Sequence, residues 1–313
     1  MTVKIAIALG GNALLRRNDR PTYADQYRRV RATAAQIARI AGRYEGLLIT
    51  HGNGPQVGEE LLRNEYARRR LQRLPLYLLN AETQASIGSM LVTALSTEFA
   101  RRRIRRGIAA VLTHVEVDAR GSAFRHPSKP VGPFYTRAEL GKALARGRFS
   151  YVHEGRMYRR VVPSPEPLSV LEIGAIKSMF DDGTVIIAGG GGGIPVHRRA
   201  TNYIGVDAVI DKDSTAQLIA TGIGADTLAI LTDVQGVYMR YPAHGAPIRE
   251  ISADELRAMA QGLEAGTMRP KAEACARFIS AGGARACIGS LDELDDVLNG
   301  SKGTQIRSAA LKR

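Results

Sequence analysis

Glycines and amide side chains occur where two apolar segments of the chain end. Gly10 and Gly11 follow the apolar run 5–9, and residues 51–56 read His-Gly-Asn-Gly-Pro-Gln after another apolar run. Glycines at a strand end let backbone N–H groups approach an anion, and the dipole of a following helix favours negative charge. The pattern predicts two anion-binding turns, although a tight strand-to-helix turn explains Gly10 and Gly11 equally well. A lone histidine in such a turn is more often a structural hydrogen-bond donor than a base, and we expect that role for His51.

A run of five glycines, Gly189 to Gly193, follows a further apolar run at 185–188. Such a run loses much conformational entropy on folding, so something must require bare backbone there. It is not a dinucleotide fingerprint, because Ile194 stands at the third glycine position, and the sequence has no Walker-type lysine motif. A flexible linker is the simpler alternative, but it fits poorly directly after a strand. We predict that Gly191 and Gly192 contact the substrate.

Lysines are scarce, and three of them stand inside the sharpest motifs. Of the 44 lysines and arginines, only eight are lysines. A lysine acts on phosphate as a compact point charge, whereas an arginine favours bidentate geometry. Lys129 lies in a Pro-Ser-Lys-Pro segment, Lys212 lies between two aspartates, and Lys271 lies near the expected start of a helix. This distribution indicates a phosphate-binding role for the three lysines.

The aspartates beside Lys212 allow two interpretations. Asp211 and Asp213 stand at an expected helix start, where aspartates cap free backbone N–H groups, and Lys212 would then be a solvated neighbour. In the functional interpretation, Lys212 binds a transferring phosphoryl group and Asp213 holds the cations in position. Preorganised cations of this kind stabilise the charge on phosphoryl oxygens.

Two segments toward the C-terminus suit an adenine nucleotide, although either could be an ordinary connection. Residues 231–238 leave a strand and include Asp233 and Tyr238, and residues 266–271 open a helix that includes Met268. Together they offer an apolar wall, an aromatic ring and a cation. We assign Asp211 and Asp233 to the nucleotide as well.

An alternating series of strands and helices must position these residues. Apolar runs predict buried strands at 5–9, 47–50, 108–112, 185–188, 228–231 and 286–288. Helical periodicity predicts helices at about 22–41, 55–71, 81–103, 169–181, 213–222, 252–261 and 269–281. This alternation indicates an α/β fold with a mostly parallel sheet covered on both faces. Ligands bind beyond the carboxyl ends of such strands, so the glycine turns should converge there.

Residues 118–167 interrupt this alternation. They contain six prolines and little apolar periodicity, and we expect no sheet strand among them. An excursion of this length in a compact domain is either functional or mobile. We interpret it as a small protruding subdomain over the active site, inserted in a single domain that spans 1–313.

Composition narrows the class of protein. The net charge is +14, but arginines cluster at expected helix ends and aromatic residues make up only 5% of the chain. Because no nucleic-acid-binding module is present, we expect no nucleic-acid partner. We also expect no membrane segment and a cytoplasmic protein. Cys275 and Cys287 are too few for a disulfide framework or a zinc site and should be buried and reduced.

These motifs, in this order, resemble the amino-acid kinase superfamily and, within it, the carbamate kinases. The similarity extends over nearly the whole chain, through segments 8–13, 51–58, 82–88, 127–134, 160–165, 190–196 and 209–213 and through Lys271. Many superfamily members carry a phosphate-binding lysine just before the first Gly-Gly pair. Here Ala8 stands at that place, as in carbamate kinases, where a lysine of the protruding subdomain supplies the charge. The Pro-Ser-Lys-Pro segment puts Lys129 in that role.

The resemblance implies a three-layer αβα sandwich, a homodimer, and Mg²⁺ carried by ATP or ADP. It implies reversible phosphoryl transfer between ATP and carbamate through carbamoyl phosphate, without a covalent enzyme intermediate. It also assigns the phosphoryl and carbamate contacts to Gly10, Gly11, Asn12, Gly52, Asn53 and Gly54. Transfer is assigned to Lys129, Lys212 and Asp213, and the nucleotide to Tyr238, Met268 and Lys271.

Two alternatives stay open. The first is another kinase of the superfamily, acting on an amino-acid carboxylate or a small phosphate monoester, which Ala8 and Lys129 disfavour. The second is a catalytically silent nucleotide sensor or nucleic-acid-binding protein. That protein would bind RNA or DNA in a salt-dependent way and would not phosphorylate ADP from carbamoyl phosphate.

Overall fold

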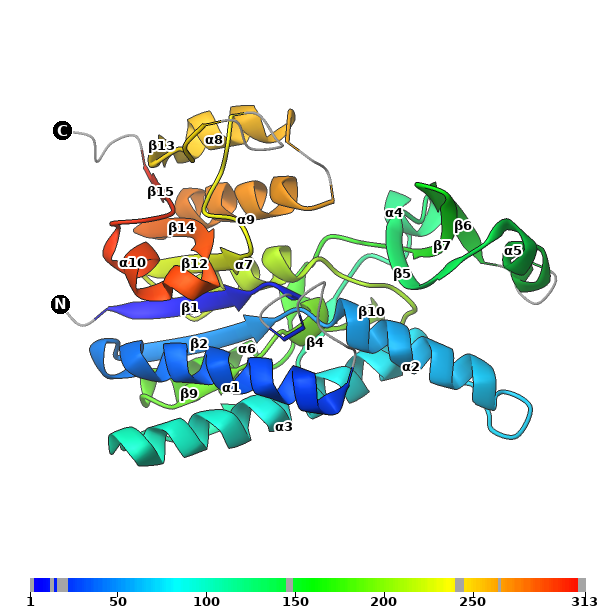
Figure 1. Cartoon of the computed structure of the whole chain (residues 1–313), viewed down its shortest axis with the longest axis horizontal. Helices are drawn as coiled ribbons and strands as arrows, with labels where there is room; N and C mark the ends of the chain where they lie inside the picture. The colour runs from blue at the N-terminus through cyan, green and yellow to red at the C-terminus, as the bar shows by residue number, and fades with distance from the viewer. Residues whose placement is uncertain are drawn as a thin grey trace.

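The structure of the chain is a computed structural model that describes residues 3–11, 14–15, 22–144, 149–239, 245–263 and 266–308. The described residues form a central eight-stranded sheet (Figure 1). Its strands, in spatial order, are β13 (Glu250–Ser252), β15 (Thr304–Arg307), β14 (Arg285–Ser290), β12 (Thr227–Thr232), β1 (Lys4–Leu9), β2 (Gly46–His51), β9 (Val185–Ile187) and β3 (Ile108–Ala110). All neighbours are parallel except β14 and β15. The prediction of a mostly parallel α/β sheet is therefore confirmed.

Helices cover both faces of this sheet. One face packs against α1 (Tyr23–Ile40), α3 (Leu76–Arg102) and α10 (Leu294–Asn299), and the other against α6 (Ile173–Asp181), α7 (Lys212–Gly222), α8 (Ala253–Ala260) and α9 (Met268–Ser280). Alternation along β1 divides its side chains between the two cores, because successive residues of a strand point to opposite faces. Ile5 and Ile7 join the α1 side, whereas Ala6 and Ala8 join the α7 side. The sandwich therefore has two separate apolar cores.

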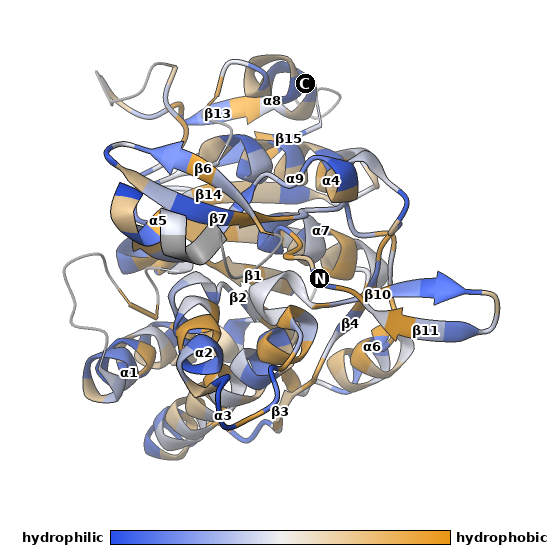
Figure 2. Cartoon of the chain, turned by 90° about the vertical axis from the view of Figure 1, so that its right-hand side faces the viewer, coloured by the Kyte–Doolittle hydropathy of each residue, from blue (hydrophilic) through white to orange (hydrophobic). Residues whose placement is uncertain are grey.

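Each predicted strand and helix occurs, with shifted ends. The helix expected from 81 begins at Leu76, directly after Pro75, and the helix expected from 169 begins at Ile173 because residues 169–170 form a short strand. A second, four-stranded sheet was not predicted; it consists of β11 (Asn202–Gly205), β10 (Ile194–Arg199), β4 (His114–Glu116) and β8 (Ser169–Val170). Its strands are short, and the β10–β11 hairpin stands out from the body with hydrophilic residues toward its tip (Figure 2). Short, half-exposed strands of this kind lack a clear apolar period.

The expectation that residues 118–167 contain no sheet strand is wrong. They hold a third sheet, in the order β5 (Lys129–Tyr135), β7 (Met157–Val162), β6 (Ser150–Glu154), with α4 (Ser122–Arg125) and α5 (Arg137–Leu144) beside it. Figure 1 shows this sheet protruding from the body beside α2 (Gly54–Ala67). Pro130 and Pro133 obscured the pattern, but both lie in β5, an edge strand, where a missing N–H is tolerated.

Two further expectations concern the two cysteines and membrane-spanning segments. Cys275 and Cys287 are both buried and unpaired, as predicted. Burial raises the pKa of each thiol, which lowers its reactivity at neutral pH. Within the described ranges, no helix combines the length and apolar character needed to span a bilayer.

Candidate active site

Four loops converge at the carboxyl edge of the central sheet. The strands β12, β1, β2 and β9 are consecutive neighbours, so the loops that follow them meet at one place. Gly10 N donates to Leu231 O at 2.9 Å, and Gly52 N donates to Leu9 O at 3.1 Å. These bonds join the two predicted anion-binding turns to the ends of their neighbouring strands.

The turns after β1 and β2 approach each other closely. A Cβ atom on Gly52 would lie 3.3 Å from Gly11 N and 3.6 Å from Lys212 Cδ. A Cβ on Gly10 would lie 3.0 Å from Leu231 O. A side chain at Gly10 or Gly52 would therefore crowd neighbouring backbone, and the Lys212 side chain lies beside the turn that contains Gly52.

The five-glycine run wraps around the polar side chains that follow β2. A Cβ on Gly191 would lie 2.2 Å from Asn53 Nδ2, and one on Gly192 would lie 2.2 Å from Ile210 O. Both residues also have positive φ, at 64° and 89°, which glycine adopts readily. The run is not a flexible linker, because it is buried and folded against Asn53.

Three lysines and two aspartates form a charged cluster at the start of α7. Asp211 caps this helix by accepting from Asp213 N at 2.9 Å, and it also receives a hydrogen bond from Lys129 Nζ at 2.9 Å. Asp213 forms ion pairs with Lys212 Nζ and, at 2.9 Å, with Lys271 Nζ. The capping interpretation of Asp211 is thus confirmed, and it coexists with lysine binding. The cluster carries one net positive charge if all five groups are ionised.

Burial and pairing set the protonation of this cluster. Burial alone would raise the pKa of Asp213, but Lys212 and Lys271 lower it to about 2. Burial lowers the pKa of Lys212 despite Asp213, whereas at Lys271 the attraction of Asp213 outweighs burial and raises the pKa. Asp213 is therefore fully ionised at neutral pH and holds both ammonium groups at the helix start.

His51 is buried and neutral at physiological pH. Burial lowers its pKa to about 4, and Lys212 contributes to the same shift. The Nδ1 atom lies 3.0 Å from Gly52 O, which can only accept, so Nδ1 carries the proton. The structure thus supports a donor that fixes the turn, in line with the sequence prediction.

The remaining predicted residues lie around this cluster. Gly54 is the exposed first residue of α2, and Asp233 follows β12 and acts electrostatically on Lys271. Tyr238 is half-buried, and Met268 packs against the α7-side core at the start of α9. Neither of these two forms a hydrogen bond with the charged cluster. Asn12 lies outside the described residues.

Several positioning residues were missed by the sequence reasoning. Asn53 Nδ2 donates to Asn80 Oδ1 at 3.1 Å and to Thr83 Oγ1 at 2.8 Å. Both partners are buried on α3, and Asn80 Nδ2 donates to Ala208 O. Thr215 Oγ1 donates to Gly192 O at 2.8 Å and thereby links α7 to the glycine run. The sequence signal that could have revealed Asn80 and Thr83 is their place as polar residues on the mostly apolar helix α3. Buried polar groups need hydrogen-bond partners, so such residues indicate a contact.

The described residues do not form a protein cage for a metal ion. No group of three or more His, Cys, Asp or Glu side chains among them could hold one. The central carboxylates, Asp211 and Asp213, are engaged by lysines. Mg²⁺ in nucleotide-binding sites is usually bound through one or two carboxylates together with substrate phosphates.

Comparison with known proteins shows where this architecture recurs. Residues 4–290 match the model of the Amino acid kinase family. The chain is 41% identical to a carbamate kinase of Pyrococcus furiosus, over 98% of this chain and 99% of that one, and 42% identical to one of Thermococcus kodakarensis, over 97% and 98%. A solved carbamate kinase from Giardia lamblia bound to AMP-PNP is 36% identical with a TM-score of 0.91, covering 98% of this chain and 99% of that chain. The chain therefore belongs to the amino acid kinase family, in its carbamate kinase branch.

Proposed function

We propose that this protein transfers a phosphoryl group reversibly between ATP and carbamate, giving ADP and carbamoyl phosphate. The observation that carries the proposal is the contact between Lys129 and Asp211. A lysine of the protruding sheet reaches the start of α7, where Lys212 also lies, while the first strand carries the buried Ala8. The full-length similarity to carbamate kinases supports the same reaction.

The proposed mechanism uses positioning and charge rather than proton transfer. Gly10, Gly11 and Gly52 let the phosphoryl group approach the backbone of the two turns; the N–H groups of Gly10 and Gly52 are engaged by neighbouring strands, so Gly11 is the one of the three that would donate to a phosphoryl oxygen. Lys212 and Lys129 neutralise the charge that develops on those oxygens. In this mechanism Lys129 exchanges its bond to Asp211 for a phosphoryl oxygen when substrate binds. Asp213 does not contact the reacting group itself; it holds Lys212 and Lys271 in position. Transfer is direct, from one oxygen to another, with no covalent enzyme intermediate.

The nucleotide takes the other side of the cluster in this proposal. Lys271 faces it from the first turn of α9 and Asp233 from the loop after β12, and Tyr238 and Met268 frame its base. A divalent metal ion, which we expect to be Mg²⁺, would be carried by its phosphates and would screen their charge. Residues 118–167 act as one subdomain that brings Lys129 to the site, within a single domain, and we expect a homodimer in solution.

A coupled assay tests the proposal. Purified protein is given ADP and carbamoyl phosphate, with and without Mg²⁺, and ATP formation is followed through hexokinase and glucose-6-phosphate dehydrogenase. We expect Mg²⁺-dependent ATP formation. A panel of amino-acid carboxylates and small phosphate monoesters with ATP serves as the control for acceptor specificity. Turnover of a panel member without turnover of carbamate would overturn the assignment.

A further inference from the structure

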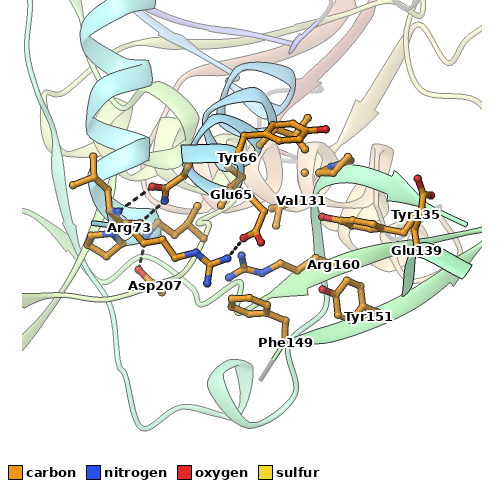
Figure 3. A pocket seen from close by; sticks show the side chains of 18 residues that line it. Glu65, Tyr66, Arg73, Val131, Tyr135, Glu139, Phe149, Tyr151, Arg160 and Asp207 are labelled. Carbon is orange, nitrogen blue, oxygen red and sulfur yellow. Dashed lines mark hydrogen bonds and ion pairs between the residues drawn. The ribbon is translucent and has the colours of Figure 1, made fainter. Parts of the chain in front are cut away.

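A cavity lies apart from the charged cluster, and no residue of the cluster lines it. Its volume is about 490 Å³, and it lies between α2, the turn that leads to α3, and strands β5 and β7 of the protruding sheet (Figure 3). None of the residues assigned above to substrate, nucleotide or catalysis lines it. Ligand sites in proteins commonly fall in this size range and at such junctions between substructures.

Aromatic rings form much of the wall. Phe149, Tyr135 and Tyr151 line the cavity from the protruding sheet, and Tyr66 lines it from α2. The rings of Tyr135 and Tyr151 meet edge to face, with centroids 5.7 Å apart. Burial raises the pKa of both phenols, so both hydroxyl groups stay neutral at physiological pH. This wall suits a planar or apolar ligand body.

Arg160 extends into the cavity without a counter-ion (Figure 3). Its guanidinium carbon lies 3.6 Å from the centroid of the Phe149 ring. Its Nε atom is buried and has no hydrogen-bond partner, and within the described part of the chain Arg160 forms no ion pair. The adjacent Arg159 differs, because its Nε donates to Gly132 O at 3.1 Å and its Nη1 lies 3.8 Å from Glu154.

The carboxylates that line the cavity are engaged elsewhere. Glu65 forms ion pairs with Arg68 and Arg73. Asp207 accepts a hydrogen bond from Leu76 N at 2.7 Å, and it acts on Arg160 only at longer range. Glu139 accepts from the backbone N–H and the hydroxyl group of Thr136, both at 2.8 Å. The described residues therefore leave the Arg160 guanidinium available to an external anion.

We propose that this cavity is a second ligand site, which binds a small molecule carrying one carboxylate or phosphate group on an aromatic or apolar body. A largely buried charge without a partner is costly, and an anion that bonds to it removes that cost. The guanidinium offers Nη donors to the oxyanion, and the aromatic wall receives the body of the ligand. Because this site shares no residue with the phosphoryl-transfer site, it can be occupied while that site is filled.

The absence of tryptophan from the chain gives a direct test. Phe149→Trp places the only tryptophan of the chain in the cavity, and its emission is excited selectively at a wavelength that the tyrosines do not absorb. The variant is titrated with phenyl phosphate, benzoate and neutral benzyl alcohol in saturating ADP and Mg²⁺, which fill the nucleotide site. We expect a saturable change in emission with the two anions, and their relative affinities decide between phosphate and carboxylate.

Variants that remove one arginine charge show whether the affinity for the anions depends on Arg160. In the Phe149→Trp background, Arg160→Gln is expected to weaken anion binding about tenfold or more, in the range for hydrogen bonds to a charged group. Arg159→Gln removes the same charge from the neighbouring position and should change the affinity by less than about twofold, because Arg159 does not line the cavity and its guanidinium is already engaged by Gly132 O and Glu154. If Phe149→Trp does not fold, the tryptophan is introduced instead at Tyr66, an exposed residue that also lines the cavity (Tyr66→Trp). No saturable response to either anion, or equal binding of benzyl alcohol, would overturn the proposal.

Discussion

Asp213 is the residue on which the charged cluster depends, and Asp213→Asn removes its charge while keeping its shape. The residue is 2% exposed and is paired with Lys212 and Lys271. Although burial opposes it, this pairing lowers the pKa of Asp213 from 3.8 to about 2. A difference of nearly two pKa units means that the ionised carboxylate stabilises the fold by about 2 kcal/mol at pH 7.

We expect Asp213→Asn to lower the free energy of unfolding by about 2 to 5 kcal/mol. The lower figure is the lost pairing, and the upper figure is typical when a buried ion pair loses one partner. Urea unfolding at pH 7, followed by circular dichroism, measures the change. Asp254→Asn is a matched control, because Asp254 also lies in the first turn of a helix but its side chain is 77% exposed. That control should change the stability by about 0.5 kcal/mol or less.

The pH dependence gives an independent check on the same residue. The folded-state pKa lies below the unfolded one, so the stabilisation is present above about pH 4 and is lost as the pH falls toward 2. The gap in stability between wild type and Asp213→Asn should therefore narrow in that window. If Asp213→Asn behaves like Asp254→Asn at pH 7, the electrostatic account of the site is wrong.

Other changes probe the lysines, the glycine run and the buried histidine. Lys129→Ala and Lys212→Ala should each lower kcat about a hundredfold or more in the coupled assay, because each removes a cation from the transferring group, and near-normal rates in both would exclude the assignment. Gly192→Ala should lower the urea midpoint, because its Cβ would collide with Ile210 O at positive φ; an unchanged midpoint would contradict this geometry. The buried His51 has a folded-state pKa of about 4 against 6.5 unfolded, so stability should fall by about 3 kcal/mol as the pH drops from 6.5 to 4. His51→Gln should remove that part of the dependence, as urea unfolding at several pH values will show.

Much of the central sheet could be predicted because its signals are local. Apolar runs such as 5–9 and 47–50 end in glycine turns, and each falls within an observed strand. In the protruding sheet, β5 escaped prediction because Pro130 and Pro133 lie in this edge strand, where proline is tolerated. The strands β6 and β7 escaped because their mostly exposed or half-exposed side chains give no apolar period. The hydrogen bonds from Asn53 to Asn80 and Thr83 on α3 also escaped prediction, because these partners lie far from Asn53 in the sequence.

The sequence by itself determined which residues carry charge and where bare backbone is required. The scarce lysines at 129, 212 and 271 and the glycines after three strands pointed to a candidate site before any fold was known. Only the tertiary structure decided which groups meet. Lys129 pairs with Asp211 across 82 positions, and Lys271 pairs with Asp213 across 58. Such contacts depend on the spatial order of the strands and on the reach of the protruding sheet, and local periodicity carries no information about either.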